Sequence, residues 1–373
     1  MQLKWFKKSI YVIKRILNMS VICLFIAVIF LFLARAIVVT VLKASHQIEY
    51  PGIDSMETVK IGGINQCIYI RGKDINNPVL LFLHGGPGTP EMPLLYKFQY
   101  EWEDYFTVVH WDQRGAGKTY FANQTNAGNV FRGSSFEQSI QDAWEVTEYL
   151  KQKLGKEKIV ILGYSWGSAI GDALVKRYPD SFSAYIGVGQ LINGAEGERI
   201  GFENVLNAAY NKGNQQDIET LEKLKPYPSN PFDITKFTSL RKIQVKYGLA
   251  VGVDIKSILG YFFSPYLTLS ELTYYLINPF ELNENIVQFA FTEYNIRDYR
   301  TDYEIPVIYI LGENDYQTPT SLAEAYFEEI QSPVKKIFIL PNSSHQPMID
   351  HPQRFTEILI SEVLPITKED DLE

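Results

Sequence analysis

The chain has 373 residues, of which 46% are hydrophobic and 21% charged, a composition typical of a folded globular protein and not of a disordered one. The formal net charge is −8, whereas nucleic-acid-binding proteins usually carry a basic excess, so we expect no nucleic-acid partner. The only two cysteines, Cys23 and Cys67, cannot build a cysteine-ligated metal site, and we expect neither a metal nor a cofactor.

An apolar segment near the N-terminus is long enough to cross a membrane. Val21–Leu42 contains one charged residue, Arg35, and about 20 apolar residues span a bilayer as a helix. If the helix begins near Ile16, Arg35 lies at the outer edge of the membrane, where its side chain can snorkel to the headgroups. Basic residues precede the segment, so the N-terminus should stay in the cytoplasm and the rest of the chain outside.

Three interpretations of this segment stay open. We favour an uncleaved single-pass anchor, with residues 1–44 as the cytoplasmic tail and membrane anchor and with the remaining chain extracytoplasmic. A cleaved signal peptide is the second, because Ala34–Ala36 has the small-x-small form of a cleavage site, and cleavage would leave a secreted protein. A long buried helix of a soluble protein is the third.

From about residue 45 onward, strand and helix patterns alternate, which predicts an α/β fold with a largely parallel sheet. Val79–His84 is continuously apolar, as expected of a strand that is buried on both faces. The predicted strands are Thr58–Ile61, Gln66–Arg71, Val79–His84, Phe106–Trp111, Lys158–Gly163, Ser183–Val188, Pro306–Leu311 and Lys336–Leu340. The predicted helices are Phe136–Leu154, Trp166–Arg177 and Gln353–Val363.

The alternation stops between residues 189 and 295. This stretch has a helical and loop-like pattern and many aromatic residues. One core that is interrupted by a helical cap explains the pattern better than two serial domains. We therefore predict a core of residues 45–188 and 296–373 and an inserted helical cap of residues 189–295.

The strongest chemical signal is Gly163-Tyr164-Ser165-Trp166-Gly167. It follows a predicted strand directly and opens a predicted helix. A sharp strand-to-helix turn of this kind holds a nucleophilic serine in a strained backbone at the top of the sheet. Glycine is needed on both sides because the turn brings backbone segments too close together for a Cβ. We therefore predict Ser165 as the nucleophile; the alternative is a tight turn with a capping serine.

A nucleophilic serine needs a base and an acid. The chain order of such triads is serine, acid, histidine. His345 follows the last predicted strand and is the predicted base, and Asp315 follows the strand before it and is the predicted acid, with Glu313 as second choice. His351 is better explained as a surface or capping residue.

An acyl-transfer enzyme also needs donors for the oxyanion that forms in the transition state. One predicted donor is the backbone N–H of Trp166, directly after the nucleophile, and the other is the N–H of Gly86 in the loop after the third strand. Pro87 has no N–H and cannot donate.

Three motifs together resemble the landmarks of proline iminopeptidase-type α/β-hydrolases. They are His84–Gly88 (HGGPG), Asp112–Gly117 (DQRGAG) and Gly163–Ser168 (GYSWGS). The resemblance covers the core from about Thr58 to Arg177 and again from Pro306 to Val363. The three motifs together are considerably more specific than the serine motif alone.

This resemblance implies an α/β-hydrolase fold and a metal-free enzyme that releases N-terminal residues, typically proline, from peptides. By resemblance, Ser165, Asp315 and His345 form its triad, and Asp112 and Arg114 are structural partners. Such enzymes hold the free amino terminus of the substrate with carboxylates, partly from the cap.

The cap is where this chain departs from the family pattern. It lacks the Trp- and Glu-containing pattern of a typical proline iminopeptidase. Its candidate substrate-binding carboxylates are Glu196, Glu198, Glu203 and Glu293. For each of them the alternative is a solvated surface carboxylate.

The sequence therefore leaves three functional hypotheses. The first is a serine aminopeptidase acting on short peptides through an acyl-enzyme, and the second is a membrane-anchored esterase or lipase-like hydrolase of small acyl substrates. The third is a non-catalytic binding protein on a hydrolase scaffold, against which the complete triad argues. Ser165 excludes dehalogenases and epoxide hydrolases, which have Asp at this position. The natural substrate and the oligomeric state stay open.

Overall fold

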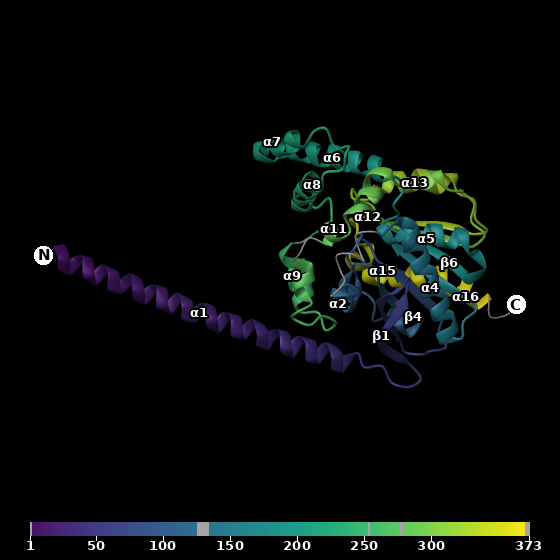
Figure 1. The fold of residues 1–373 in the computed structure, drawn as a ribbon, viewed down its shortest axis with the longest axis horizontal. Coiled ribbons are helices and arrows are strands. Elements are labelled where there is room, and N and C mark those ends of the chain that lie inside the picture. Colours follow the sequence, from purple (N-terminus) through teal and green to yellow (C-terminus); the bar gives the residue numbers. More distant parts are fainter. Residues whose placement is uncertain (1, 125–133, 253, 277–278, 370–373) are drawn as a thin grey trace.

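The computed structural model describes residues 2–124, 134–252, 254–276 and 279–369. One sheet forms the centre of the molecule, and a long helix, α1, extends away from it (Figure 1). The sheet has eight strands in the order β1-β2-β4-β3-β5-β6-β7-β8. The strands are β1 Ile53–Ile61, β2 Ile64–Gly72, β3 Val79–Leu83, β4 Thr107–Asp112, β5 Ile159–Tyr164, β6 Phe182–Val188, β7 Val307–Gly312 and β8 Lys335–Leu340.

The predicted α/β architecture with a mostly parallel sheet is confirmed. Strands β1, β2 and β4 pair in antiparallel fashion, and all pairs from β4 to β8 are parallel. Every residue of β3, β4, β5, β6 and β7 is buried, as their apolar runs indicate. The edge strand β1 instead alternates between half-buried and exposed residues up to its last residue, Ile61, which is buried. The carboxyl ends of the parallel strands therefore meet at one edge of the sheet, where loops can place reactive side chains.

Helices cover both faces of the sheet. The core helices are α2 Gly117–Ala122, α4 Phe136–Leu154, α5 Trp166–Arg177, α13 Thr320–Glu329, α14 Pro347–Asp350, α15 Pro352–Ile358 and α16 Leu364–Glu369. The sequence pattern did not indicate α13, and the C-terminal helix continues past its predicted end at Val363. Helix α4 begins and ends where its capping residues predict: Ser135 accepts from the Gln138 N–H, and Gly155 closes the helix with a positive φ of 64°.

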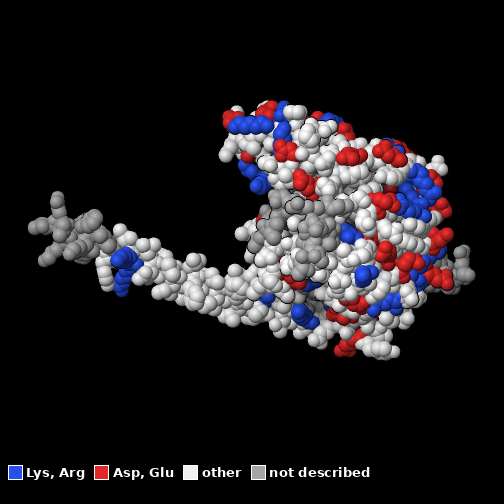
Figure 2. All heavy atoms as spheres, in the orientation of Figure 1, with Lys and Arg blue, Asp and Glu red and all other residues white. Residues whose placement is uncertain are grey.

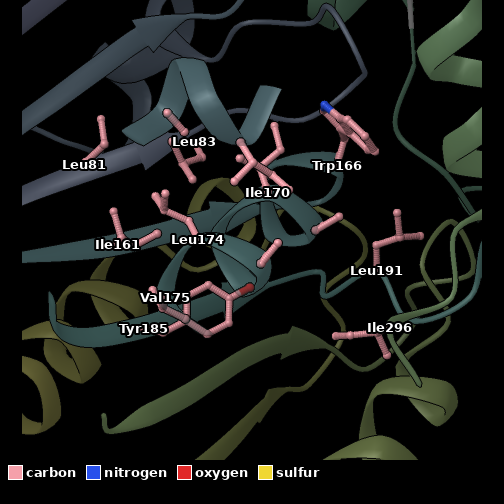
Figure 3. Packing of buried hydrophobic residues seen from close by; sticks show 14 of the residues in the cluster. Leu81, Leu83, Ile161, Trp166, Ile170, Leu174, Val175, Tyr185, Leu191 and Ile296 are labelled. Atoms are coloured by element: carbon pink, nitrogen blue, oxygen red, sulfur yellow. The ribbon is translucent and has the colours of Figure 1, made fainter. Parts of the chain in front are cut away.

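Helix α5 packs directly on the sheet, as Figure 3 shows for Ile170 and Leu174 beside Leu83 and Ile161. All four side chains are fully buried. Because burying one such side chain stabilises a fold by roughly 1.5–3 kcal/mol, this contact fixes the start of α5, and with it Ser165, relative to β3 and β5.

The segment between β6 and β7 is helical. Its helices are α6 Gly194–Asn211, α7 Gln215–Leu224, α8 Ile234–Lys246, α9 Ile255–Phe262, α10 Leu272–Leu276, α11 Pro279–Leu282 and α12 Glu284–Gln288, followed by the turns Phe289–Glu293 and Ile296–Asp298. Helices α6, α7 and α8 enclose a small core of their own around Val205, Leu221 and Leu240. This helical segment lies over the carboxyl-end loops of the sheet as a cap (Figure 1).

The N-terminal helix α1 runs without interruption over Gln2–Ser45, longer than the predicted apolar stretch. Its part from Ile13 to Ser45 is long and apolar enough to cross a membrane, and none of its most apolar stretch is buried inside the protein. The interpretation as the buried helix of a soluble protein is therefore wrong. A membrane anchor or a signal sequence remains, because both are apolar helices near the N-terminus.

Candidate active site

Ser165 lies at the sharp turn between β5 and α5. Its φ of 53° and ψ of −121° are a strained combination for a residue with a side chain. Its N–H donates to the Val188 carbonyl oxygen over 2.9 Å, which ties the turn to the end of β6. A Cβ on Gly167 would collide with the Leu83 carbonyl oxygen, and one on Gly163 would lie 2.7 Å from the Gly167 oxygen. The two glycines of the motif are therefore required by backbone packing at this turn.

His345 and Asp315 are brought together from the loops after β8 and β7. His345 Nδ1 lies 2.7 Å from Asp315 Oδ2, and both side chains are buried. The other carboxylate oxygen, Oδ1, accepts the backbone N–H groups of Gln317 and Thr318 over 2.9 and 3.0 Å. The Thr318 hydroxyl donates to Oδ2 over 3.0 Å. This network orients the carboxylate, which in turn holds the imidazole with its proton on Nδ1.

The second ring nitrogen of His345, Nε2, is buried and has no hydrogen-bond partner among the described residues. The ring stands close to the nucleophile turn: its centroid lies 5.1 Å from the ring of Tyr164, the residue before Ser165. A Cβ on Gly189, which follows the Val188 partner of Ser165, would lie 3.0 Å from His345 Cε1. A buried imidazole with one nitrogen held by a carboxylate and the other unpaired can accept a proton from a nucleophile.

Two backbone segments with oxyanion-donor character meet at this turn. Trp166 opens α5, and the first N–H groups of a helix have no acceptor within the helix. Gly86 has a φ of 114°, and a Cβ on Gly85 would lie 3.0 Å from Ser165 Cβ, so the HGGPG loop runs directly past the serine. The cap closes over this loop, because the buried hydroxyl of Tyr274 donates to the carbonyl oxygen of Gly88 over 2.6 Å.

His84 and His110, in the first half of the chain, are buried and hydrogen-bonded within the core. His84 Nδ1 donates to the Gly85 carbonyl, and Nε2 accepts the Gln113 N–H over 3.1 Å, so this ring joins the HGGPG loop to the DQRG turn. Complete burial lowers the pKa of His84 to about 4 and that of His110 to about 3, and both rings are neutral at pH 7.

The DQRG residues expected to be structural also have internal partners. Arg114 binds both carboxylate oxygens of Asp142 over 3.0 Å and the Gly62 carbonyl over 2.8 Å. Asp112 Oδ2 accepts the Lys118 N–H over 2.7 Å at the start of α2. Burial raises the pKa of Asp112 to about 7.

The acidic residues predicted to bind substrate are either exposed or already paired within the cap. Glu196 forms an exposed ion pair with Arg199, and Glu293 is exposed at the end of its turn. Glu198 is buried, but one of its oxygens binds Arg241 and the other accepts the Tyr227 hydroxyl, so both oxygens are occupied within the cap. Their positions give these carboxylates structural or solvent-exposed roles.

Glu203, the remaining acidic candidate of the cap, is exposed and pairs with Arg199 over 2.6 Å. It thus shares one arginine with Glu196 on the outer face of α6. An exposed carboxylate already paired with arginine has no special tendency to recruit a substrate.

Sequence reasoning missed a different carboxylate, Glu91. It lies three residues after the HGGPG motif and is only 3% exposed. Its Oε2 has no hydrogen-bond partner among the described residues, and its Oε1 has only a long contact of 3.5 Å with Gln346 Nε2. Burial raises its pKa to about 8. The signal in the sequence that could have indicated Glu91 is its position. It is an acidic residue between Pro90 and the apolar run that begins at Met92, in the loop that carries the HGGPG motif.

Glu91 is a neighbour of the triad residues. Gln346, which contacts its Oε1, follows His345 in the chain, and the positive charge of Lys97 also acts on Glu91. Burial first, and then the negative charges of Glu91 and Asp315, raise the pKa of Tyr164 well above its ordinary value, which puts both carboxylates within electrostatic reach of the residue beside Ser165.

A tyrosine of the cap lies within electrostatic reach of the same carboxylate. Burial and the charge of Glu91 raise the pKa of the cap residue Tyr261. The ring of Tyr261 stacks on that of Tyr275 at 4.3 Å between centroids, and the buried Tyr275 hydroxyl has no hydrogen-bond partner among the described residues. The predicted serine–histidine pair thus lies near a buried carboxylate oxygen, Glu91 Oε2, and the Tyr275 hydroxyl, and neither has a hydrogen-bond partner within the described ranges. Unpaired buried polar groups are costly, and a polar ligand would satisfy them.

Comparison with known proteins supports the fold. Residues 78–233 match the family described as alpha/beta hydrolase fold. The chain is 28% identical to the "Probable aminopeptidase YbaC" of Bacillus subtilis over 319 residues, which cover 83% of this chain and 96% of that protein.

Solved structures share the fold at lower identity. The proline iminopeptidase of Mycobacterium smegmatis superposes with a TM-score of 0.58 at 18% identity, over 85% of this chain and 99% of that one. A membrane phospholipase A described as a bacterial virulence factor superposes with a TM-score of 0.58 at 16% identity, over 95% of this chain and 99% of that one.

Proposed function

Because the chain is a hydrolase of the α/β-hydrolase family, we propose that it is a serine aminopeptidase that acts on short peptides with a free amino terminus and is anchored in a membrane by α1. The observation that favours an aminopeptidase over other hydrolases is the buried side chain of Glu91. A buried carboxylate with an unpaired oxygen beside the catalytic centre suits a substrate ammonium group. The similarity to a probable aminopeptidase over most of the chain supports the same choice.

In the proposed mechanism, His345 Nε2 takes the proton of the Ser165 hydroxyl while Oγ attacks the carbonyl carbon of the first peptide bond. Asp315 stabilises the imidazolium that results. The tetrahedral intermediate collapses, the C–N bond breaks, and the imidazolium gives its proton to the leaving amine. Water then attacks the acyl-enzyme ester with His345 as base, and Ser165 regains its proton.

Two backbone donors stabilise the oxyanion in this mechanism. They are the N–H groups of Gly86, in the loop that passes Ser165, and of Trp166, the residue after Ser165. Loss of one such donor costs about 2.7–4 kcal/mol in the transition state of a serine protease. Tyr274 supports the arrangement, since its hydroxyl binds the Gly88 carbonyl and so holds the HGGPG loop against the cap.

Glu91 would hold the ammonium group of the substrate in the same step. A free Glu91 is mostly protonated at pH 7 because its pKa is about 8. An ammonium group at its unpaired oxygen favours the carboxylate form and replaces the missing hydrogen bond. A substrate without a positive charge, such as an N-acetylated peptide, gives no such compensation and should be excluded.

A membrane-anchored esterase or lipase-like hydrolase is the second candidate. The observation that favours it is the apolar surface that α9 exposes next to α1, which suits acyl substrates from a lipid environment. The membrane phospholipase A that shares the fold is consistent with this alternative.

The proposed topology follows from the charges that flank the apolar part of α1. Lys14 and Arg15 mark the cytoplasmic side, and the catalytic domain lies outside. Arg35 marks the outer side. In the folded protein its guanidinium donates to the carbonyl oxygens of Phe262 and Leu267, both over 2.7 Å.

The decisive experiment compares amide and ester substrates with the full-length enzyme in detergent. Proline-, alanine- and leucine-naphthylamides would be tested with free and with N-acetylated amino groups, next to p-nitrophenyl acetate and butyrate. Cleavage that requires the free amino group and disappears in Ser165→Ala would support the aminopeptidase. Cleavage of esters alone would support the second candidate, and activity that survives in Ser165→Ala would refute the serine mechanism.

A further inference from the structure

The cap is attached to the N-terminal helix at one point. Arg35 of α1 donates to the backbone oxygen of Phe262, the last residue of α9, and to that of Leu267 in the segment after α9. Its guanidinium also lies over the Phe262 ring, 5.7 Å from the centroid. One turn earlier in α1, the Phe32 ring meets the edge of Phe262 at 5.7 Å. Helix α9 is therefore docked on α1, whereas the charged helix α7 lies at the far end of the cap (Figure 1).

This docking point lies at a defined depth if α1 crosses a membrane, as proposed above. The hydrocarbon core of a bilayer is about 30 Å thick, which corresponds to about 20 helical residues at 1.5 Å each. Starting after the basic pair Lys14 and Arg15, such a stretch begins at Ile16 and ends at Arg35. Figure 2 shows the part of α1 between its basic N-terminal residues and the folded domain as uncharged. Arg35, and with it the end of α9, thus falls at the outer boundary of the hydrocarbon.

At this level the cap exposes apolar side chains. Ile255 is 71% exposed, Ile258 and Leu259 are each 42% exposed, and Leu269, in the turn after α9, is 47% exposed. Lys256 is exposed on the same helix and can reach phosphate headgroups. An apolar face with a basic residue is the composition of helices that lie in a membrane interface.

The same segment is joined to the active-site loop. The Tyr96 hydroxyl donates to the Gly260 carbonyl over 2.9 Å, and the Ser264 hydroxyl donates to the Pro93 carbonyl over 2.6 Å. Tyr96 and Pro93 belong to the short helix Met92–Lys97, which begins directly after Glu91. Helix α9 is thus bound to α1 on one side and to the core on the other. Its exposed face cannot rotate relative to α1 unless these contacts break.

From these observations we infer that α9 and the turn to Leu269 form a membrane-contact surface that rests in the outer leaflet of the bilayer crossed by α1. Ile255, Ile258, Leu259 and Leu269 enter the boundary between headgroups and acyl chains. The partner is the lipid of this leaflet, since the bilayer that α1 crosses has its outer boundary at the level of Arg35. The inference rests on the proposed membrane crossing and is independent of the substrate.

A depth measurement with a fluorescent label tests this surface in the full-length protein. Cys23 lies exposed in α1, whereas Cys67 is buried and burial raises the pKa of its thiol, so Cys23 is the reactive native cysteine. In a Cys23→Ala background, Ile258→Cys would carry an environment-sensitive dye, and Glu219→Cys on the exposed face of α7 would be the matched control. The labelled proteins would be reconstituted into phosphatidylcholine–phosphatidylglycerol vesicles with doxyl-lipids that bear the quencher near the headgroup or near the chain end.

The expected result is a blue shift and strong quenching at residue 258 by the shallow quencher, with no quenching at residue 219. A dye on Cys23 in the wild-type chain reports on α1 separately and should be quenched by the deep quencher. Deep quenching at Cys23 without any at 258 would overturn the membrane-contact surface and leave the anchor intact. A blue shift at 258 without lipid quenching would show that a second copy of the chain covers it, which also overturns the inference. No quenching at Cys23 would overturn both the anchor and the surface.

Discussion

Replacing Glu91 by Gln tests the proposed ammonium site most directly. The substitution keeps the size of the side chain and its contact with Gln346 but removes the negative charge. Truncating one partner of a buried charge pair typically costs about 2–5 kcal/mol. At about 1.4 kcal/mol per factor of ten, kcat/KM for a free-amino naphthylamide should fall by about 30-fold to several thousand-fold. Hydrolysis of p-nitrophenyl acetate, which has no ammonium group, should change little.

The pH dependence of this substrate preference follows from the pKa of Glu91. With a pKa of about 8, roughly one tenth of Glu91 is ionised at pH 7, and an α-amino group with a pKa near 7.7–8.0 loses its proton in the same range. The pair needs an ionised carboxylate and a protonated amine. For the wild type, kcat/KM with a free-amino substrate should therefore be bell-shaped with a maximum near pH 8. In Glu91→Gln, the fall in kcat/KM on the acid side that comes from protonation of Glu91 should disappear.

The same substitution should change the stability in a pH-dependent manner. Burial raises the pKa of Glu91 from 4.5 to about 8, so the folded state binds this proton more tightly than the unfolded state does. The stability that comes from this proton is fully present below pH 4.5 and is lost as the pH rises through about 8. At about 1.4 kcal/mol per unit, the wild type should lose up to about 5 kcal/mol relative to Glu91→Gln between these limits. Urea unfolding at pH 5 and pH 9 measures the difference.

Glu196→Gln is the matched control, because this carboxylate is exposed and paired with Arg199. It should leave the kinetics with both substrates and their pH profiles unchanged. Equal losses on amide and ester substrates in Glu91→Gln would refute the ammonium site, since they would indicate a general distortion of the active site. An unchanged preference for free amino groups would refute it as well.

Three further predictions concern the triad and the cap. Ser165→Ala should lower kcat by at least about a thousandfold, because the nucleophile is lost, and activity staining with a fluorophosphonate probe should vanish. Gly189→Ala should lower kcat by about tenfold to a hundredfold, because its Cβ would press on His345 at 3.0 Å and its φ of 51° disfavours a side chain; steady-state kinetics measure this. Arg241→Ala should destabilise the protein by about 3–5 kcal/mol in urea unfolding, because Glu198 would stay buried without its partner.

Each of these predictions has a contrary outcome. A fluorophosphonate label that persists in Ser165→Ala would mean that another residue is the nucleophile. A normal kcat in Gly189→Ala would mean that His345 is free to shift or is not the base. An unchanged unfolding midpoint in Arg241→Ala would mean that water reaches Glu198 in the folded cap.

Local patterns in the sequence determined the fold class and the candidate triad. The apolar runs of β3 and β5 are buried on both faces, and such runs are recognisable without knowledge of their neighbours. The motif around Ser165 dictates its turn, because Gly163 and Gly167 are needed wherever a strand turns this sharply into a helix. The chain order of strands was also sufficient to put Asp315 and His345 into neighbouring loops, where they now lie 2.7 Å apart.

Only the tertiary structure decided which acidic residues are buried and which of them lack partners. Glu198 and Glu91 look alike in the sequence, yet Arg241 neutralises the first, whereas the second keeps an oxygen without a described partner after the HGGPG loop. Likewise, the sequence indicated that α1 could cross a membrane, but the contact of Arg35 with Phe262 could not be inferred, because it joins residues 227 positions apart. Burial and pairing depend on neighbours that are distant in the chain. Strand and turn patterns, in contrast, depend on residues within a few positions of one another, and these the sequence displays directly.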